Sequence, residues 1–352
     1  MPEKKVRIGF VGVGGMGQAA HLRNYVMVPD CEVVALAEVK PDQARKVAAR
    51  WGVAKVYASH EELLAHEKLD GIVASQPFTR HGTLVPDLLK AGIPVLTEKP
   101  IAGSVEMGQK IVQAARAGKT WMMIGYHKRS DPATMLAKQE IVRLQQSQEL
   151  GKLTYIRILM PSGDWIANGF NQNVASHDPN PTLAWDAPAS DMDKATNDAY
   201  IGFVNYYIHQ VNLMRHLLGE TWSVNYAARS GLLLAGESAS GVTCSIEMTP
   251  YSTTVDWQEH ALVCFERGWV RLELPSPLAF TRPGRVEIFR DPGKGATPRT
   301  EIPQLPWVHA MWSQAQNFVA AIQGKQPTMC TAEDALEDIK LAREYIRIWK
   351  GK

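Results

Sequence analysis

The stretch 6-VRIGFVGVGGMG-17 decides the fold of the first part of this chain. Its apolar, β-branched start predicts a buried strand over residues 6–13, and its end matches the pattern G-x-G-x-x-G at Gly12, Gly14 and Gly17. In that pattern the first glycine permits a tight turn, the second lets the backbone approach a pyrophosphate, and the third allows close helix–sheet packing. The N–H groups that begin the following helix then bind phosphate. The stretch therefore predicts a dinucleotide site.

An acidic residue at the end of the next predicted strand, EVVALAE (32–38), supports this interpretation. Glu38 follows Gly17 at about the 20-residue spacing expected of such a unit. A carboxylate there accepts hydrogen bonds from the ribose hydroxyls and repels a 2′-phosphate, which favours NAD over NADP. Lys40 leaves NADP open as the less favoured alternative, because a cation two residues further on could receive that phosphate.

Short apolar runs alternate with helical patterns through the first 125 residues. Beyond the first two strands, further strands are expected at 71–75, 94–98 and 121–125. Helical segments lie between them, such as 41–52, which Pro41 opens and Gly52 closes. Strand alternating with helix predicts a doubly wound parallel sheet, the Rossmann arrangement.

The rhythm changes after about residue 127. A helix (131–148) leads to a strand (152–161), then to a long unpatterned stretch (162–198) and to one helix over about 199–218. Strand-like segments without intervening helices follow, which predicts a large, mostly antiparallel open sheet, and two helices close the chain. The fold class is thus α/β plus α+β. We predict two domains: an NAD-binding Rossmann domain, 1–127, and an α+β domain for substrate binding and oligomerisation, 128–352.

Composition excludes several classes of function. The 352 residues carry a formal net charge of +2 and are 45% hydrophobic and 21% charged, so nothing favours nucleic acid, and no apolar run is long enough for a membrane span. The four cysteines form no C-x-x-C pair, which is typical of a reducing compartment and indicates a cytoplasmic protein. His177 and Asp178 lack the spacing of a ligand set, so no metal is predicted.

Motifs along nearly the whole chain point to one family. Besides the glycine loop, the sequence contains a His81 segment, 98-EKP-100, 125-GYHKRSDP-132, 150-LGKLTYIRI-158 and 318-FVAAIQGKQPTMCTAEDAL-336. In this combination the chain resembles the glucose–fructose oxidoreductase/inositol dehydrogenase family, often written Gfo/Idh/MocA. The resemblance implies a dehydrogenase or reductase that acts on CH–OH groups of carbohydrates with a nicotinamide cofactor.

Lys99 is the first catalytic candidate. It follows a central parallel strand at its carboxyl end, where open α/β sheets bind ligands. The resemblance implies that Lys99 contacts both the nicotinamide ribose and the substrate hydroxyl, where a cation stabilises a developing alkoxide or polarises a carbonyl. The alternative is an ordinary surface lysine near a turn.

His209 is the second catalytic candidate. The family pattern places Asp-x-x-x-His on a helix of the second domain, and this chain has Asn205-x-x-x-His209, followed by Asn212. Spacing of four predicts that Asn205 and His209 share one helix face. An amide cannot exchange protons at neutral pH, so His209 is expected to carry the acid/base work and Asn205 to orient the substrate. Without a neighbouring carboxylate, the neutral, base-competent imidazole is favoured. The alternative is a structural histidine bonded to the two amides.

The resemblance also assigns further contacts. Cofactor contacts are expected from Gly12, Gly14, Gly15, Met16, Gly17, Glu38, Ser75, Pro77, His81, Glu98, Lys99 and His127, and His127 is a second acid/base candidate. Substrate contacts are expected from Lys99, Tyr126, Trp165, Asn205, Tyr206 and His209; of Tyr206 and Tyr207, one is expected to pack in the core. The acids of 162–198 suit a polyhydroxylated ligand, although most are expected to be solvated or to cap helices.

The sequence thus predicts an NAD-dependent oxidoreductase that moves a hydride to or from a secondary hydroxyl of a sugar, cyclitol or glycoside, with the 3-position as one candidate. One alternative is a redox-neutral glycoside-processing enzyme with tightly held NAD, and another is a non-catalytic NAD-binding regulator. The second-domain sheet is expected to bury its open face in a homodimer or homotetramer, as it often does in the family that the chain resembles.

Overall fold

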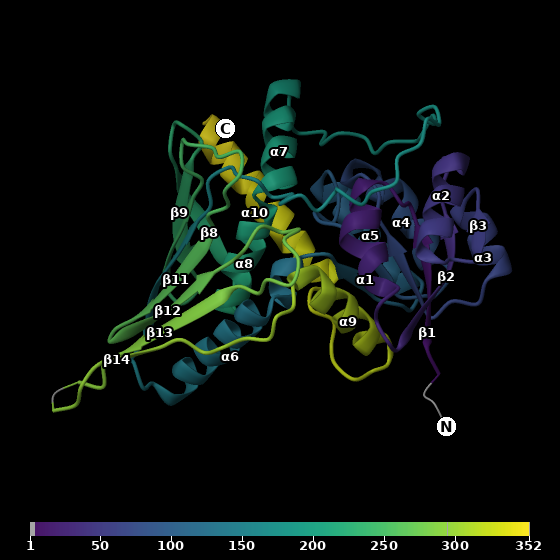
Figure 1. The fold of residues 1–352 in the computed structure, drawn as a ribbon. Helices are drawn as coiled ribbons and strands as arrows, with labels where there is room; N and C mark the ends of the chain where they lie inside the picture. Colours follow the sequence, from purple (N-terminus) through teal and green to yellow (C-terminus); the bar gives the residue numbers. More distant parts are fainter. Residues whose placement is uncertain (1–3, 294, 352) are drawn as a thin grey trace. The chain divides into compact units, whose positions relative to one another are not determined.

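The computed structural model describes residues 4–293 and 295–351, and its contacts divide the chain into two compact units (Figure 1). The first unit comprises the residues up to Tyr126 together with Asn168–Asn205 and Met311–Ile339. The second comprises His127–Ala167, Tyr206–Ala310 and the residues from Lys340 on. One segment from the middle of the sequence and one from near its end therefore belong by contact to the N-terminal unit. The domain bounds 1–127 and 128–352 remain a prediction, and their ends, residues 1–3 and 352, lie outside the described residues.

The first unit contains a six-stranded parallel sheet in the order β3-β2-β1-β4-β5-β6. Its strands are β1 (Val6–Val11), β2 (Cys31–Ala37), β3 (Lys55–Tyr57), β4 (Gly71–Ala74), β5 (Val95–Thr97) and β6 (Met122–Ile124). The chain order along the sheet reverses between β1 and β4, and in such sheets ligands bind beyond the carboxyl ends of the strands at that point. The doubly wound parallel sheet predicted from the sequence is confirmed, and the short edge strand β3 is an addition to it.

Helices and helical turns connect these strands. They are η1 (Gly17–Leu22), α1 (Arg23–Tyr25), α2 (Pro41–Trp51), α3 (His60–His66), η2 (Phe78–Arg80), α4 (His81–Leu89) and α5 (Val105–Ala117), and α7 (Lys194–Tyr206) and α9 (Ala310–Ile322) come later in the chain. The predicted start and stop of α2 are confirmed: Pro41 is its first residue, and Gly52 ends it with a left-handed φ of +68°.

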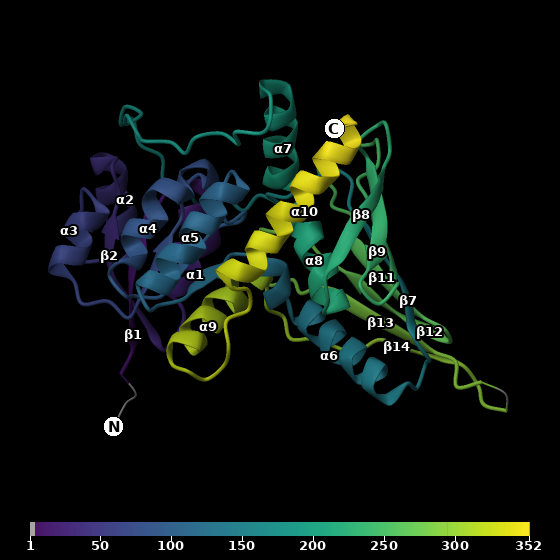
Figure 2. The same cartoon turned by 180° about the vertical axis from the view of Figure 1, so that it is seen from behind.

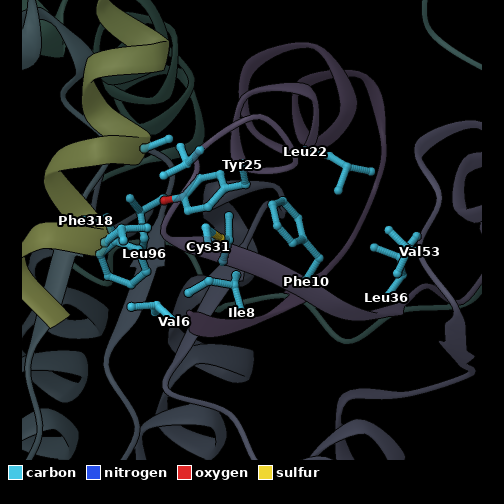
Figure 3. Packing of buried hydrophobic residues seen from close by; sticks show 14 of the residues in the cluster. Val6, Ile8, Phe10, Leu22, Tyr25, Cys31, Leu36, Val53, Leu96 and Phe318 are labelled. Carbon is cyan, nitrogen blue, oxygen red and sulfur yellow. The ribbon is translucent and has the colours of Figure 1, made fainter. Parts of the chain in front are cut away.

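An aromatic cluster forms the centre of the first core (Figure 3). Phe10 of β1 meets Tyr25 edge to face at 5.5 Å between ring centroids, and Tyr25 meets Phe318 of α9 at 6.4 Å. All three rings are buried. Removing a buried ring of this size costs about 3–5 kcal/mol, so this cluster is a principal attachment of α9 to the Rossmann sheet.

The second unit is built on an eight-stranded sheet in the order β14-β13-β12-β11-β7-β10-β9-β8 (Figure 2). Its strands are β7 (Leu153–Leu159), β8 (Trp222–Ala227), β9 (Leu233–Ser238), β10 (Thr243–Glu247), β11 (His260–Phe265), β12 (Gly268–Glu273), β13 (Arg285–Arg290) and β14 (Arg299–Glu301). Of the pairs in this order, β7–β10 is parallel and the others are antiparallel, so the predicted mostly antiparallel sheet is confirmed. Its helices are η3 (His127–Ser130), α6 (Pro132–Ser147), α8 (Ile208–Leu218) and the C-terminal part of α10 (Ala332–Lys350). α6 packs on β12 and β13, and α8 on β7 and β10.

The prediction of a single helix over 199–218 is wrong, because the structure has two helices there, α7 and α8, with Tyr207 between them. Neither proline nor glycine marks the break, which explains why local sequence did not reveal it. Tertiary contacts fix it instead. The Tyr206 hydroxyl bonds to the Gly163 backbone, and the Tyr207 hydroxyl lies 3.4 Å from Ser162 Oγ. Asn205 and His209 therefore do not share one face of a continuous helix.

No helix in the described part of the chain combines the length and apolarity that a membrane crossing requires.

Candidate active site

The glycine loop after β1 has a tightly packed base and an open outer backbone. Gly12 adopts a left-handed φ of +90°, and a Cβ there would lie 2.5 Å from the Ser75 carbonyl oxygen. A Cβ on Gly17 would lie 2.7 Å from the Gly12 carbonyl oxygen. A Cβ on Gly14, in contrast, would meet no heavy atom within 4 Å. Glycine is needed at the two ends for packing, and the open middle of the loop fits the close approach of a diphosphate.

The chain after the loop continues this cradle. Met16 precedes η1, a π-helical turn that starts at Gly17, and such turns are frequent at functional sites. A Cβ on Gly15 would lie 3.7 Å from the Phe170 ring, so this glycine faces the segment 168–205 of the same unit.

Glu38 lies directly beside the loop. Its carboxylate accepts hydrogen bonds from the backbone N–H groups of Val13, at 2.9 Å, and Lys40, at 3.1 Å. A carboxylate has about four acceptor positions, so these two bonds orient it and leave capacity for ribose hydroxyls. The fold thus brings Glu38 next to the glycine loop, as the spacing of the sequence motif predicts.

The residues after β4 complete the edge of the sheet. The Ser75 N–H donates to the Val11 carbonyl at 3.0 Å, and Pro77 directly precedes the turn η2. His81 is fully buried, with its ring nitrogens 3.1 Å from the Ile101 carbonyl oxygen and 3.2 Å from that of Gln76. Burial lowers the pKa of His81, against the opposing effect of these hydrogen bonds. The histidine ties the turn to the chain after β5, and its contact with a cofactor stays a prediction.

Glu98 forms a buried pair with His21 of η1, Nε2 to Oε1 at 2.8 Å. Sequence reasoning missed His21, since no motif marks a histidine four residues after the last loop glycine. Burial alone would raise the pKa of Glu98, but the hydrogen bond from His21 and the positive charges of His21 and Lys99 shift it downward overall. The pair joins the helix that follows the glycine loop to the carboxyl end of β5.

Lys99 is half-buried and directly follows this pair. Its ammonium donates to the backbone carbonyl of Asn205 at 2.6 Å, in the last turn of α7. A cation is favoured at the C-terminal end of a helix, where carbonyl groups and the negative end of the dipole face it. The structure therefore brings together two of the predicted catalytic residues, although the Asn205 contact is made by the main chain and its side chain is exposed.

In the second unit, His127 and His209 lie against each other. Their imidazole rings meet edge to face with centroids 4.7 Å apart and 70° between the planes, and both side chains are buried. His127 also lines a small pocket together with Asp131, Arg282 and His309. The two acid/base candidates thus form one local cluster.

Buried polar contacts fix the helix that carries His209. Gln210 donates to Glu259 Oε1 at 2.7 Å, and the Lys128 ammonium contacts Glu259 Oε2 at 2.5 Å. Arg129 Nε donates to the Asn212 side-chain oxygen at 2.7 Å. Lys128 and Arg129 both belong to η3, so η3 is tied to α8 at two residues, to Gln210 through Glu259 and to Asn212 directly. Sequence reasoning assigned no role to Lys128, Arg129 or Glu259.

The remaining substrate candidates are divided between the two units. Tyr126 is buried at the end of the first unit. In the second unit Tyr206 and Trp165 are both linked to Gly163: the Tyr206 hydroxyl bonds to its N–H at 3.2 Å, and the Trp165 N–H donates to its carbonyl at 3.0 Å. Burial raises the pKa of Tyr206. Tyr206 and Tyr207 are both half-buried, and their ring centroids lie 5.0 Å apart.

Metal ligation finds no support in residues 4–293 and 295–351, where His, Cys, Asp and Glu side chains form no group of three or more suited to an ion. A nicotinamide dinucleotide, in contrast, fits the residues present. The glycine loop offers the open backbone for the diphosphate, Glu38 the acceptor for a ribose, and Lys99 a cation at the same edge of the parallel sheet.

Comparisons with known proteins show what the chain is similar to. Residues 6–126 match the family GFO_IDH_MocA, described as an oxidoreductase family with an NAD-binding Rossmann fold. An inositol 2-dehydrogenase of Rubrobacter xylanophilus is 26% identical over 346 residues, covering 96% of this chain and 89% of that protein. The rhizopine catabolism protein MocA of Rhizobium meliloti is 24% identical over 340 residues, covering 96% and 93%.

Solved structures show the same fold over the whole chain. A putative myo-inositol dehydrogenase from Sinorhizobium meliloti has a TM-score of 0.70 at 20% identity and covers 99% of this chain and 98% of that one. A putative NADPH-dependent oxidoreductase from Desulfitobacterium hafniense has a TM-score of 0.76 at 14% identity, with coverage of 99% and 97%. With the family match over residues 6–126, the relatives that span 96% of the chain and the shared two-sheet fold together, the chain resembles the Gfo/Idh/MocA oxidoreductases along its length and is a dehydrogenase that acts on CH–OH groups.

Proposed function

We propose that the protein transfers a hydride between NAD and a secondary hydroxyl or ketone of a sugar, cyclitol or glycoside. The observation that carries this proposal is the position of Lys99. It follows β5 at its carboxyl end, on the same edge of the parallel sheet as the glycine loop, and the buried, hydrogen-bonded side chain of Glu98 precedes it. Relatives named inositol 2-dehydrogenase support a cyclitol or sugar as the substrate class.

The glycine loop and Glu38 would hold the dinucleotide, through its diphosphate and a ribose respectively. When bound, the nicotinamide supplies the acceptor or donor of the hydride. The Lys99 ammonium stabilises negative charge on the substrate oxygen and lowers the cost of losing the hydroxyl proton. His209 takes or returns that proton as general base or acid. The exposed amide of Asn205 orients the substrate, since it can donate and accept hydrogen bonds but not exchange protons.

His127 is proposed as the neighbour that holds the His209 ring. Its edge-to-face contact restricts the orientation of the His209 imidazole, and η3 and Glu259 hold the backbone of α8. In this proposal η3 holds α8 in place, and α8 in turn holds the His209 imidazole. All of these residues belong to the second unit.

The test is an NADH-linked screen over a panel of inositols, sugars and glycosides, with Lys99→Ala as the blank. NADH formed by the wild-type chain and not by the blank supports the proposal. Bound NAD that survives gel filtration with substrate turned over but no NADH released would instead indicate the redox-neutral glycoside-processing alternative. A non-catalytic regulator would keep its response after replacement of Lys99 or His209.

We also propose that this is a cytoplasmic protein that assembles as a homodimer or homotetramer through the open face of the second sheet. Tyr155, Cys264, Trp269 and Phe289 are register partners on four adjacent strands and alternate with buried residues of the opposite face. The rings of Trp269 and Phe289 stack at 5.8 Å between centroids. Such a half-buried apolar row fits a subunit contact. Light scattering of the wild type and of Trp269→Glu tests it, with a smaller mass expected for the variant.

A further inference from the structure

A segment from the middle of the chain, residues 173–186, is bonded to three places on the carboxyl edge of the Rossmann sheet; we name it the crossing segment. At the glycine loop, Asn173 Nδ2 donates to the Gly15 carbonyl at 3.1 Å, and Val174 exchanges two hydrogen bonds with the Gln18 side chain. Figure 1 draws the crossing segment as the teal loop that reaches α2 and α4. All of these contacts lie within the first unit.

Asp178 occupies the N-terminus of α2. Its carboxylate accepts from the backbone N–H groups of Gln43, at 2.9 Å, and Asp42, at 3.3 Å. Pro41 has no N–H, and the Ala44 N–H already donates to the Lys40 carbonyl at 2.9 Å. Each backbone N–H group at the start of α2 that could bind a phosphate therefore already has an acceptor, and for two of these groups the acceptor is Asp178.

Asn180 engages the cation next to this helix start. Its side-chain oxygen accepts from Lys40 Nζ at 3.0 Å. Lys40 follows Glu38 by two residues, and its backbone N–H donates to the Glu38 carboxylate. The ribose acceptor, the neighbouring cation and the start of α2 thus form one continuous stretch, and the crossing segment covers it with two side chains.

We propose that Asp178 and Asn180 set the cofactor preference of this enzyme by excluding the 2′-phosphate of NADP. This inference rests on the proposed NAD-dependent function and names what selects the cofactor at that site. A 2′-phosphate next to Glu38 has two natural partners here, the Lys40 ammonium and the N–H groups that begin α2. The crossing segment already forms hydrogen bonds with both partners. Glu38 and Asp178 also place two carboxylates on the backbone of residues 40–43, where a phosphate would meet like charge.

The charge of Asp178 supports this role. Burial acts to raise the pKa of Asp178, but the hydrogen bonds that it accepts and the charge of Arg45 lower it overall. The carboxylate is therefore ionised at the pH of any activity measurement. NAD has a hydroxyl where NADP has the phosphate, so only NADP meets this repulsion.

Asp186 provides a matched control in the same segment. It caps α4 as Asp178 caps α2, with hydrogen bonds from the Gly82 N–H at 2.8 Å and the Thr83 hydroxyl at 2.7 Å. Because α4 follows β4 and not β2, Asp186 lies on a different strand end from Glu38. Its replacement removes the same charge and the same kind of cap without uncovering Lys40 or α2.

The experiment measures dissociation constants of NAD and NADP for the full chain by calorimetry. In Asp178→Asn, and in Asp178→Ser as a second variant, the ratio Kd(NADP)/Kd(NAD) is expected to fall about tenfold, and further when Asn180→Ala is added. The fall should shrink at high salt, because the repulsion is screened. Asp186→Asn should leave the ratio unchanged.

The outcomes separate the two proposals. Wild-type binding of NAD with an unchanged ratio in the Asp178 variants overturns the inference and leaves the proposed function intact. An equal fall in Asp186→Asn also overturns it, because loosening of the crossing segment would then be the cause. If neither nucleotide binds to any of the proteins, the proposed function and the inference fail together.

Discussion

The imidazole of His127 contacts that of His209 edge to face, with 4.7 Å between ring centroids. One of these rings carries the proposed proton transfer, and the contact gives a way to decide which. Replacing His209 with Gln should lower kcat by about 10²–10⁴-fold and remove its inflection from the pH–rate profile, because general acid/base catalysis is lost. His127→Asn should lower kcat less and keep the inflection. Steady-state NADH formation between pH 5 and pH 9 checks both, and an unchanged profile in His209→Gln would rule out the assigned role.

Lys99 is expected to act in the chemical step more than in binding. Lys99→Ala should reduce kcat by about 10²–10³-fold, the range for removing a group that stabilises developing charge on oxygen, with a smaller change in KM. Lys90→Ala is the matched control, since Lys90 is an exposed lysine of the same unit that pairs with Asp87 on the surface. A loss confined to KM would show that Lys99 only binds substrate.

The buried pair His21–Glu98 should make a pH-dependent contribution to stability. Because the pKa of Glu98 is lowered in the folded protein, the stabilisation is present above its ordinary value of 4.5 and is lost as the pH falls through the lower folded value. His21→Phe should cost about 3–5 kcal/mol of unfolding free energy at pH 7, because it leaves a buried carboxylate without its partner. Denaturant unfolding measures this, and adding Glu98→Gln should recover much of the loss. Equal stabilities of the single and double variants would contradict it.

Asp131 should show the opposite dependence. Burial raises the pKa of Asp131 to about 6, although hydrogen bonds from the Ala133 and Gly284 N–H groups act to lower it. The protonated acid is therefore favoured by folding, and this contribution is lost as the pH rises from 3.8 through about 6. Asp131→Asn keeps an acceptor for both N–H groups and should flatten the change in Tm between pH 4 and pH 7. A wild-type pH dependence in the variant would contradict this.

The ion pair Lys128–Glu259 is expected to support His209 through α8. Lys128→Met should destabilise the protein by about 3–5 kcal/mol, since Glu259 would be left buried and charged. Adding Glu259→Gln should restore most of that stability while keeping the acceptor for Gln210. If kcat also returns in the double variant, the pair serves to position α8. Stability regained without kcat would instead assign Lys128 a direct role in the reaction.

Much of the fold was predictable because its signals are local. The strand before Gly12, the Pro41 and Gly52 ends of α2 and the alternation of strands with helices all depend on neighbouring residues. β3 escaped prediction because it has three residues and little burial. The break at Tyr207 depends on contacts with residues 162 and 163, which no periodicity between 199 and 218 could reveal.

The candidate site divides in the same way. The glycine loop, Glu38 and Lys99 could be assigned because motif spacing carries their geometry. His21, Glu259 and Asp178 could not, because each acts on a distant partner: Asp178 and Gln43 are separated by 135 positions in sequence. The sequence led us to expect that most acids of 162–198 are solvated or cap helices. Asp178 and Asp186 do cap helices, but these helices, α2 and α4, are far from them in the sequence.

The assignment of the crossing segment to the first unit has a consequence for recombination. A chimaera joined at residue 127 would take its Rossmann strands from one parent and residues 173–186 from the other. Glu38 and Asp178, the two carboxylates of the proposed ribose site, would then come from different parents. Given the proposed role of Asp178, we expect that exchanging the second domain between related dehydrogenases alters cofactor choice as well, unless the crossing segment is kept with the glycine loop.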